Sequence, residues 1–362
     1  MFVAWRDLKF AKGRFALMGT VIVLITLLVG LLSGLTAGLG RQNTSAITGL
    51  PADKIAFQAP SGGQDVSYSN STVTEKQWQK WANIPGVESA EPLGITTTKA
   101  TAAGRSTGVS ALGVQPGSRL APAGNKLDER SVVLSATAAD DLGIKPGNTF
   151  TLAGQQLIVA AVQGDASFSH TPVIWTSLDV WQRTAPPTAD VDGPTATVIA
   201  LKITSGTDTT AADQAAGTKT VSKDDSLSAI GSYTSENSSL QLMRGFLFAI
   251  SALVIGAFFT VWTIQRSGDV AVLKALGAST ANLLKDALGQ AVVLLTGGTL
   301  IGTGIAAGVG ALVAGSAVPF LLTPATVLIP AAVMILLGAL GAGLSIRRIT
   351  SVDPLTALGN AR

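Results

Sequence analysis

Four long apolar runs constrain this chain more than any other feature of its sequence. They cover residues 15–39, 246–264, 288–315 and 326–346. Each is close to, or longer than, the roughly 20 residues that a helix needs to cross a bilayer. Only 13% of the residues are charged, whereas soluble domains carry about 25%. The sequence therefore predicts a polytopic α-helical membrane protein with four transmembrane helices.

The first apolar run is interpreted as an uncleaved transmembrane helix. A signal peptide has an apolar core of only about 7–15 residues, which is shorter than the uncharged stretch 15–39. Aromatic and basic residues are mixed in the preceding segment, residues 1–14, a pattern typical of an amphipathic helix in the membrane interface.

Glycines recur at four-residue spacing inside the runs, at positions 30, 34 and 38 and again at 298 and 302. Small residues at this spacing let helix backbones approach closely. They predict tight helix contacts, either within the chain or along the seam of a homodimer.

Residues 40–240 are polar and turn-rich, and they hold most of the prolines. We expect them to form one large α+β domain of one or two lobes, inserted between the first two transmembrane helices. Short strands are expected at 132–134, 149–152, 157–162, 172–175 and 197–203, and helices near 74–81, 136–142, 177–182 and 223–230. The residues expected in its core and rim are Trp78, Trp81, Trp175 and Trp181.

Charge is distributed unevenly over the two sides of this topology. The short segments 1–14, 265–286 and 347–362 hold ten basic residues against four acidic ones, whereas the rest of the chain is more acidic than basic. Basic short segments stay in the cytoplasm. Both termini are therefore expected to be cytoplasmic, and the inserted domain extracytoplasmic.

The resulting map is a cytoplasmic amphipathic helix at 1–14, transmembrane helix 1 at 15–39, the extracytoplasmic α+β domain at 40–240, the end of a stalk with transmembrane helix 2 at 241–264, a cytoplasmic segment at 265–286, transmembrane helices 3 and 4 at 287–315 and 326–346, and a cytoplasmic tail at 347–362.

The sequence contains few motifs that indicate an enzyme. The dipeptide Gly-Lys of a phosphate-binding loop never occurs, and no serine lies in a G-x-S-x-G turn. There is no cysteine and one histidine, His170, in a polar loop, which we interpret as a solvated loop residue. We expect no catalytic residue, no cofactor of the chain's own and no nucleic-acid partner.

The segment 265–286 carries the most specific motif. Its string RSGDVAVLKALGAS at 266–279 resembles the R-x-x-E-I-A-[IV]-[LM]-[KR]-A-[LIM]-G-A signature of MacB and FtsX type ABC transporter permeases, with Asp269 where the signature has Glu. The order of one span, a large external domain and three spans is also that of this family. So is a tail in which Arg347 and Arg348 precede the Asp353-Pro354-Leu355 triplet.

The resemblance implies that 265–286 is a coupling helix docked on a separate ATPase subunit, which binds and hydrolyses the ATP. The pump would be a homodimer with two ATPase copies in the plasma membrane, in a Gram-positive or other single-membrane bacterium. Gly277 is expected to end the coupling helix, and Ser279 or Thr280 to begin the next helix. The expected coupling residues are Arg266, Asp269, Lys274, Ala275, Leu276, Gly277 and Ala278.

A second stretch, residues 232–248, resembles the haem-exporting branch of the same family. Tyr233, Glu236 and Met243 lie on one helical face by spacing, and Arg244 follows them. The resemblance implies a haem site, with Tyr233, Glu236 or Met243 as iron ligands and Arg244 facing a propionate. Since the apolar runs hold no histidine, the other candidate iron ligands are Met18 and Met334.

Other functions fit the same architecture. The cargo could be a lipid, a lipoprotein or an antimicrobial peptide. Alternatively, the chain could transmit force to an external cell-wall enzyme, as FtsX type proteins do. The residues 233–244 would then be a plain stalk helix with interfacial anchors.

Overall fold

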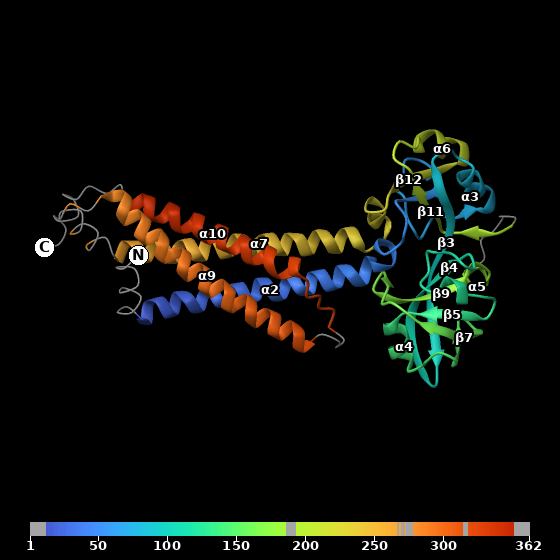
Figure 1. Ribbon diagram of the computed structural model, residues 1–362, viewed down its shortest axis with the longest axis horizontal. Helices are drawn as coiled ribbons and strands as arrows, with labels where there is room; N and C mark the ends of the chain where they lie inside the picture. Colours follow the sequence, from blue (N-terminus) through green and yellow to red (C-terminus); the bar gives the residue numbers. More distant parts are fainter. Residues whose placement is uncertain are drawn as a thin grey trace. The chain divides into compact units, whose positions relative to one another are not determined.

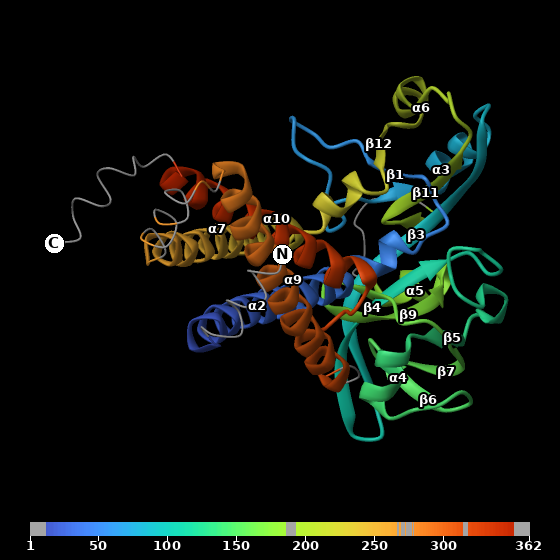
Figure 2. The same ribbon diagram turned by 60° about the vertical axis from the view of Figure 1, so that its left-hand side comes forward.

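The computed structural model describes residues 12–185, 193–265, 268, 272, 277, 279–313 and 318–350. The chain divides into two compact units. We call residues Leu39–Ser238 the α+β unit, and Met1–Gly38 with Ser239–Arg362 the helical unit. Figures 1 and 2 show their elements.

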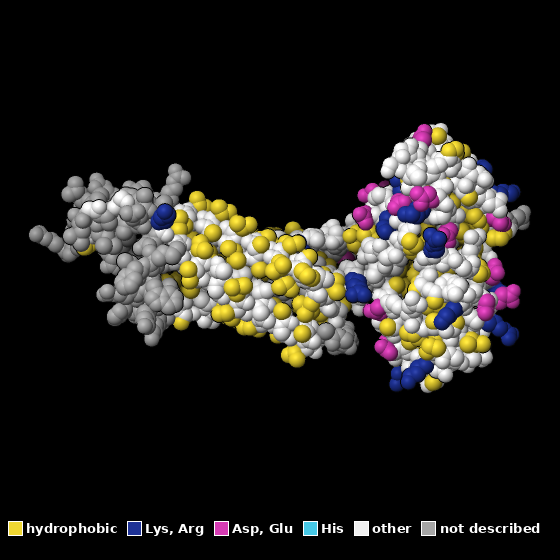
Figure 3. All heavy atoms as spheres, viewed as in Figure 1, with side chains coloured by type: hydrophobic (Ala, Val, Ile, Leu, Met, Phe, Trp, Pro, Cys, Tyr) yellow, Lys and Arg dark blue, Asp and Glu magenta, His cyan; other side chains and the backbone are white. Residues whose placement is uncertain are grey.

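Four long helices build the helical unit: α2 (Lys12–Thr48), α7 (Tyr233–Gln265), α9 (Thr280–Val313) and α10 (Pro324–Thr350). Each contains a segment long and apolar enough to cross a membrane, namely Phe15–Thr48, Tyr233–Gln265, Ala287–Val313 and Pro324–Leu344. Apolar side chains cover their outer surface (Figure 3), whereas Lys, Arg, Asp and Glu gather on the α+β unit. The four predicted transmembrane helices are confirmed.

Two of these helices extend beyond the apolar runs. α2 continues to Thr48, past the end of the first run at residue 39, and α7 begins at Tyr233, before the second run. Backbone hydrogen bonding within a helix does not depend on apolar side chains. Both helices therefore continue from the helical unit into the α+β unit.

Glycines let α2 and α9 pack closely. A Cβ added at Gly302 would meet the backbone oxygen of Val23 and the Cβ of Thr26, and one at Gly298 would meet Ile22. The tight helix contacts expected from glycine spacing are thus confirmed within one chain.

The segment between α9 and α10 folds back onto α2. Phe320 fills the space that a Cβ on Gly34 or Gly310 would need, and the backbone N–H of Leu321 donates to the carbonyl of Gly34 at 3.0 Å. The half-buried ring and the satisfied N–H allow irregular backbone beside membrane-spanning helices.

Between α2 and α7, the α+β unit contains twelve strands and four α-helices among the described residues. The strands are β1 (Lys54–Gln58), β2 (Val73–Thr74), β3 (Val87–Ala102), β4 (Arg105–Val114), β5 (Ser131–Leu134), β6 (Thr149–Leu152), β7 (Gln155–Val162), β8 (Ser167–Phe168), β9 (Thr171–Ser177), β10 (Thr195–Ala196), β11 (Val198–Ile203) and β12 (Thr218–Ser222). The helices are α3 (Glu75–Ala82), α4 (Ala136–Leu142), α5 (Leu178–Thr184) and α6 (Thr209–Ala216). The predicted α+β domain is confirmed.

One long strand, β3, joins two lobes of this unit. Its first half pairs with β11, from Leu93↔Val198 to Val87↔Ile203, and its second half pairs with β4, from Gly94↔Gly113 onward. Figure 2 shows β1, β11 and β12 with α3 and α6 in one lobe, and β4, β5, β7 and β9 with α4 and α5 in the other. The sheet order β12-β1-β11-β3-β4-β9-β5-β7-β6 is continuous, so the lobes share one sheet.

A cross-strand pair of glycines lies where β3 passes between the lobes. Gly94 of β3 faces Gly113 of β4, and a Cβ on either would enter the indole of Trp181 from α5. All four tryptophans expected in the core and rim are buried, with exposed fractions of 6% or less.

Several predicted elements of this unit agree with the structure and others do not. Helix 136–142 and strand 149–152 have the expected bounds. Residues 223–230 were expected to form a helix but contain only the short 3₁₀ turn Asp225–Ala229. The β3–β4 hairpin was not predicted, because its glycine-rich and threonine-rich strands lack a clear alternation of apolar and polar residues.

Candidate functional site

The carboxylate of Glu236 is the centre of a small polar cluster in the α+β unit. Oε2 of Glu236 lies 2.7 Å from Nε2 of His170 and accepts a hydrogen bond from Nδ2 of Asn43 at 3.0 Å. Asn43 also donates to the hydroxyl of Ser232 at 3.4 Å. The three segments are far apart in sequence: the end of α2, the β8–β9 turn and the first turn of α7.

Backbone contacts hold the β8–β9 turn against α2. The N–H of Ser169 donates to the carbonyl of Asn43 at 2.9 Å, and that of His170 to the carbonyl of Gln42 at 3.1 Å. Ser169 and His170 have φ angles of 48° and 64°, in the left-handed region that non-glycine residues rarely adopt. These contacts direct the imidazole toward Glu236.

The two ends of the cluster differ in their exposure to solvent. Asn43 is only 2% exposed, and its Oδ1 has no hydrogen-bond partner among the described residues. The side chains of His170 and Glu236 are 32% and 41% exposed. The described residues provide no hydrogen bond to Oε1 of Glu236. One carboxylate oxygen is therefore held, and the other is available to a ligand.

His170 lies in the β8–β9 turn and is 32% exposed, as expected of a loop residue, but its contact with Glu236 was not predicted. A single sequence carries no signal for its contact with Glu236, because 66 residues separate them and only the packing of the turn on α2 brings them together. His170 and Asn43 are the residues of this cluster that the sequence analysis did not assign.

The other predicted haem-site residues also lie on α7. Tyr233 is half-buried and packs against the core of the α+β unit. Met243 is 54% exposed, and Arg244 is half-buried. Tyr233 and Glu236 belong to the α+β unit, whereas Met243 and Arg244 belong to the helical unit.

The alternative iron ligands Met18 and Met334 are core residues. They are 6% and 1% exposed and lie in one apolar cluster with Phe259 and Leu295. A thioether in such surroundings fills packing space. In the described part of the chain, no three His, Cys, Asp or Glu side chains group into a metal site.

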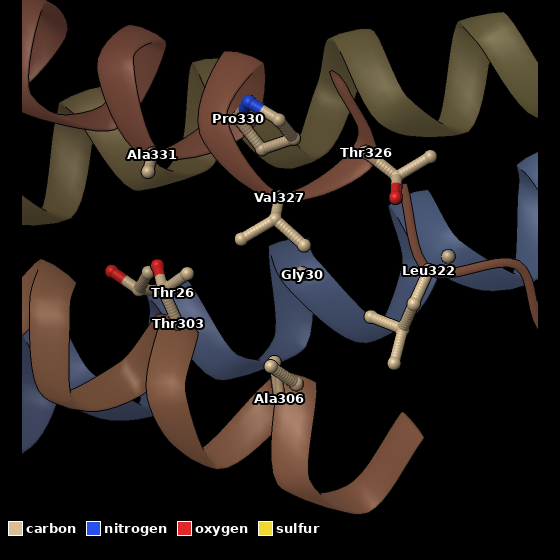
Figure 4. A pocket seen from close by; sticks show the side chains of 11 residues that line it. Thr26, Gly30, Thr303, Ala306, Leu322, Thr326, Val327, Pro330 and Ala331 are labelled. Atoms are coloured by element: carbon tan, nitrogen blue, oxygen red, sulfur yellow. The ribbon is translucent and has the colours of Figure 1, made fainter. Parts of the chain in front are cut away.

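The helical unit contains a small gap between α2, α9 and α10 (Figure 4). Thr26, Thr303 and Ala306 line it, and Val327 points from α10 toward Gly30. Its volume is about 10 Å³, about enough for one water molecule. The gap has no room for a bulky cargo.

Most of the expected coupling residues lie outside the described residues: Arg266, Asp269, Lys274, Ala275, Leu276 and Ala278. Gly277 is described, and its φ of 93° is in the left-handed region. α9 begins at Thr280, as expected from a helix break at Gly277.

Two family profiles match most of the chain. The profile of the MacB-like periplasmic core domain matches residues 15–219, and the profile of the FtsX-like permease C-terminal region matches residues 242–354. The first profile includes Asn43 and His170, which contact Glu236, and the second includes the segment that holds the coupling motif.

The chain is also similar over its full length to bacterial permeases. It is 25% identical to the hemin transport system permease protein HrtB of Staphylococcus haemolyticus, over 99% of both chains. It is 26% identical to HrtB of Staphylococcus epidermidis over 100% of both chains. Among solved structures, the periplasmic region of MacB from Actinobacillus actinomycetemcomitans matches with a TM-score of 0.34 and 13% identity, covering 49% of this chain and 92% of that one.

Proposed function

Because the chain belongs to the MacB/FtsX family of ABC transporter permeases, we propose that it is the permease subunit of an efflux pump whose cargo is haem. It would act as a homodimer with two copies of a separate ATPase subunit. Its termini and residues 265–286 would be cytoplasmic and its α+β unit extracytoplasmic, in the plasma membrane of a single-membrane bacterium. The permease itself would catalyse no reaction.

The observation that carries the haem proposal is the arrangement of Glu236 at the start of α7. Its carboxylate has one oxygen held by Asn43 and His170 and the other without a described partner. Met243 follows seven residues later on the same helix, which is about two turns, and is exposed. A carboxylate and a thioether on one helical face are reasonable ligands for a haem iron. The similar staphylococcal proteins are named for hemin transport.

The helix α7 provides a direct mechanical link. It is continuous over 33 residues from Tyr233 to Gln265, about 50 Å at 1.5 Å per residue. Its end adjoins residues 265–286, where we place the ATPase contact. ATP-driven movement of that segment would therefore shift Glu236 and its surroundings, which would release a bound amphiphile outward.

Haem binding can be tested on the full-length chain in lipid nanodiscs. We expect added hemin to give a shifted Soret band. Glu236→Gln should weaken binding by about tenfold or more, equal to about 1.4 kcal/mol. Glu129→Gln, which neutralises an exposed carboxylate elsewhere in the α+β unit, is the matched control. The haem proposal would be abandoned if the native chain gave no Soret shift, or if both variants bound hemin equally.

The ATPase partner requires a separate test. Co-purification from the native membrane should recover an ABC ATPase with the chain, and Lys274→Glu should reduce its recovery, because the charge of the expected contact is reversed. Recovery of the native chain without any ATPase would contradict the pump assignment.

The rival functions use the same continuous helix but need no iron ligand. Export of a lipid, lipoprotein or antimicrobial peptide, or force transmission to a cell-wall enzyme, predicts equal haem tolerance of cells carrying the native chain and Glu236→Gln. Haem export predicts that the variant cells are more sensitive to haem.

A further inference from the structure

A pocket of about 390 Å³, partly open to solvent, lies in the α+β unit, and the residues of the Glu236 cluster do not line it. Three segments far apart in sequence line it: residues 45–51 at the end of α2, the loop 119–122, and residues 163–166, with Trp175 of β9 beside them. Its volume is within the range of about 300–1,000 Å³ that is usual for small-molecule sites.

The wall of the pocket is apolar and firmly packed. Ala46, Leu50, Leu120, Ala121 and Trp175 line it, and each is 6% exposed or less because each also belongs to the core. Such a wall excludes water from an apolar ligand without having to reorganise.

Hydrogen bonds fix the polar segments around this wall. The loop that carries Arg119 is closed by the N–H of Gly117, which donates to the carbonyl of Gly124 at 3.0 Å. The hydroxyl of Ser118 accepts from the N–H of Leu120 at 3.0 Å. On the opposite side, Ser45 accepts from the N–H of Ser167 at 2.8 Å. The pocket is therefore preformed.

Arg119, which is exposed to solvent, provides a positive charge without a described protein partner at the rim of this pocket. Among the described residues, no carboxylate lies within 4.0 Å of its guanidinium, and no hydrogen bond to it is formed. The carboxylate of Glu91 accepts a hydrogen bond from the hydroxyl of Ser118, the residue that precedes Arg119. A guanidinium pairs with a carboxylate through two parallel hydrogen bonds.

We propose that this pocket binds an amphiphile that carries a carboxylate on an apolar body, with Arg119 pairing with the carboxylate. Two sources share this chemistry: a porphyrin bearing propionates, and a fatty acid from the membrane. Binding at this pocket needs no iron, so it can be tested separately from the proposed haem site at Glu236.

The test uses the full-length chain in nanodiscs, with empty nanodiscs as background. The probes are metal-free protoporphyrin IX, its dimethyl ester and oleate. Because protoporphyrin IX has no iron, Glu236 and Met243 cannot ligate it, and a loss of binding in Arg119→Gln therefore tests this pocket and not the proposed iron site. We expect Arg119→Gln to lower the affinity for the acid probe at least fivefold, and the ester to bind the native chain as weakly as the acid binds Arg119→Gln.

Lys126→Gln is the matched control, since it removes an exposed positive charge from the same region without lining the pocket. Ala166→Trp, which fills the pocket, should abolish binding of whichever acid probe binds. Arg119-dependent binding of protoporphyrin IX would identify a porphyrin as the ligand. Arg119-dependent binding of oleate alone would identify a membrane fatty acid. Equal binding by Arg119→Gln and Lys126→Gln, or ester binding as tight as acid binding, would overturn the proposal.

Discussion

Oε2 of Glu236 lies 2.7 Å from Nε2 of His170, and Asn43 donates to the same oxygen at 3.0 Å. The side chain that we propose as an iron ligand is thus already held by two hydrogen bonds. Iron can bind Oε1 while Oε2 stays bonded to the imidazole. The hydrogen bond at Oε2 draws charge away from Oε1, so His170 would compete with the iron for the charge of the carboxylate and favour release of the cargo.

This competition predicts the effect of His170→Asn on hemin binding. Asn tolerates the left-handed φ of this position but is too short to replace the imidazole. A hydrogen bond of this kind is worth about 0.5–1.5 kcal/mol, so hemin affinity should rise about threefold or more. Hemin titration of the full-length chain in nanodiscs measures it. Ser169→Asn, in the same turn, is the control. A loss of affinity in His170→Asn would mean that His170 binds the haem instead of competing with it.

The glycine pair beneath Trp181 predicts a large difference between two substitutions in neighbouring strands. Gly94→Ala should destabilise the α+β unit by about 1–3 kcal/mol, because the new methyl group enters the indole ring. Gly108→Ala in β4, whose Cβ would meet Thr171 only at 3.9 Å, should have little effect. Thermal unfolding of the two variants, followed by tryptophan fluorescence, measures the difference. Equal stability of Gly94→Ala and Gly108→Ala would show that Trp181 does not pack against Gly94.

Two glycines of α9, Gly302 and Gly304, test the packing of this helix on α2. Gly302→Ala should destabilise the helical unit by about 1–3 kcal/mol, since its Cβ would lie 2.6 Å from the carbonyl oxygen of Val23. Gly304→Ala has no atom within 4 Å of the new Cβ, and Ala is the better helix former by about 1 kcal/mol, so it should be neutral or stabilising. Unfolding by denaturing detergent compares them. The packing described here would be wrong if Gly304→Ala were the more damaging change.

Tyr68 predicts a loss of stability in alkaline solution. Burial raises the pKa of Tyr68 well above its ordinary value, although the hydrogen bond with Ser226 opposes this effect. The folded state then retains the phenolic proton more tightly than the unfolded state. Stability from this group is complete below the ordinary pKa of about 10 and falls as the pH rises above it.

The two tyrosines of the chain make this prediction directly measurable. In Tyr233→Phe, only Tyr68 remains, and its tyrosinate absorbance should emerge well above pH 10. Tyr68→Phe should remove the corresponding part of the alkaline destabilisation. Titration of the remaining tyrosine at its ordinary pKa would contradict the burial of Tyr68.

Local patterns were enough to predict much of the fold. The apolar runs predicted the four spans because crossing a bilayer requires a fixed length of apolar helix. The strands β6 and β7 and the helix α4 were predicted from alternation and turn residues over a few positions. The MacB/FtsX assignment came from the motif at 266–279, which the two matching family profiles confirm.

Contacts between distant segments could not be predicted in this way. The split pairing of β3 between β11 and β4, the position of Trp181 on Gly94 and the fold-back of Phe320 all depend on partners far along the chain. The candidate site divides in the same manner. Glu236 and Met243 were proposed as ligands on the same helical face, but His170 and Asn43 reach Glu236 only through tertiary packing. Tertiary packing also brings Arg119 to its pocket.

The sequence by itself determined where the chain crosses the membrane, how its charges are distributed and which family it belongs to, since each follows from local composition or a contiguous motif. Only the tertiary structure decided which polar groups meet. The β8–β9 turn brings the single histidine to Glu236 because two backbone hydrogen bonds hold Ser169 and His170 against the end of α2, and no rule based on neighbours in sequence contains that contact.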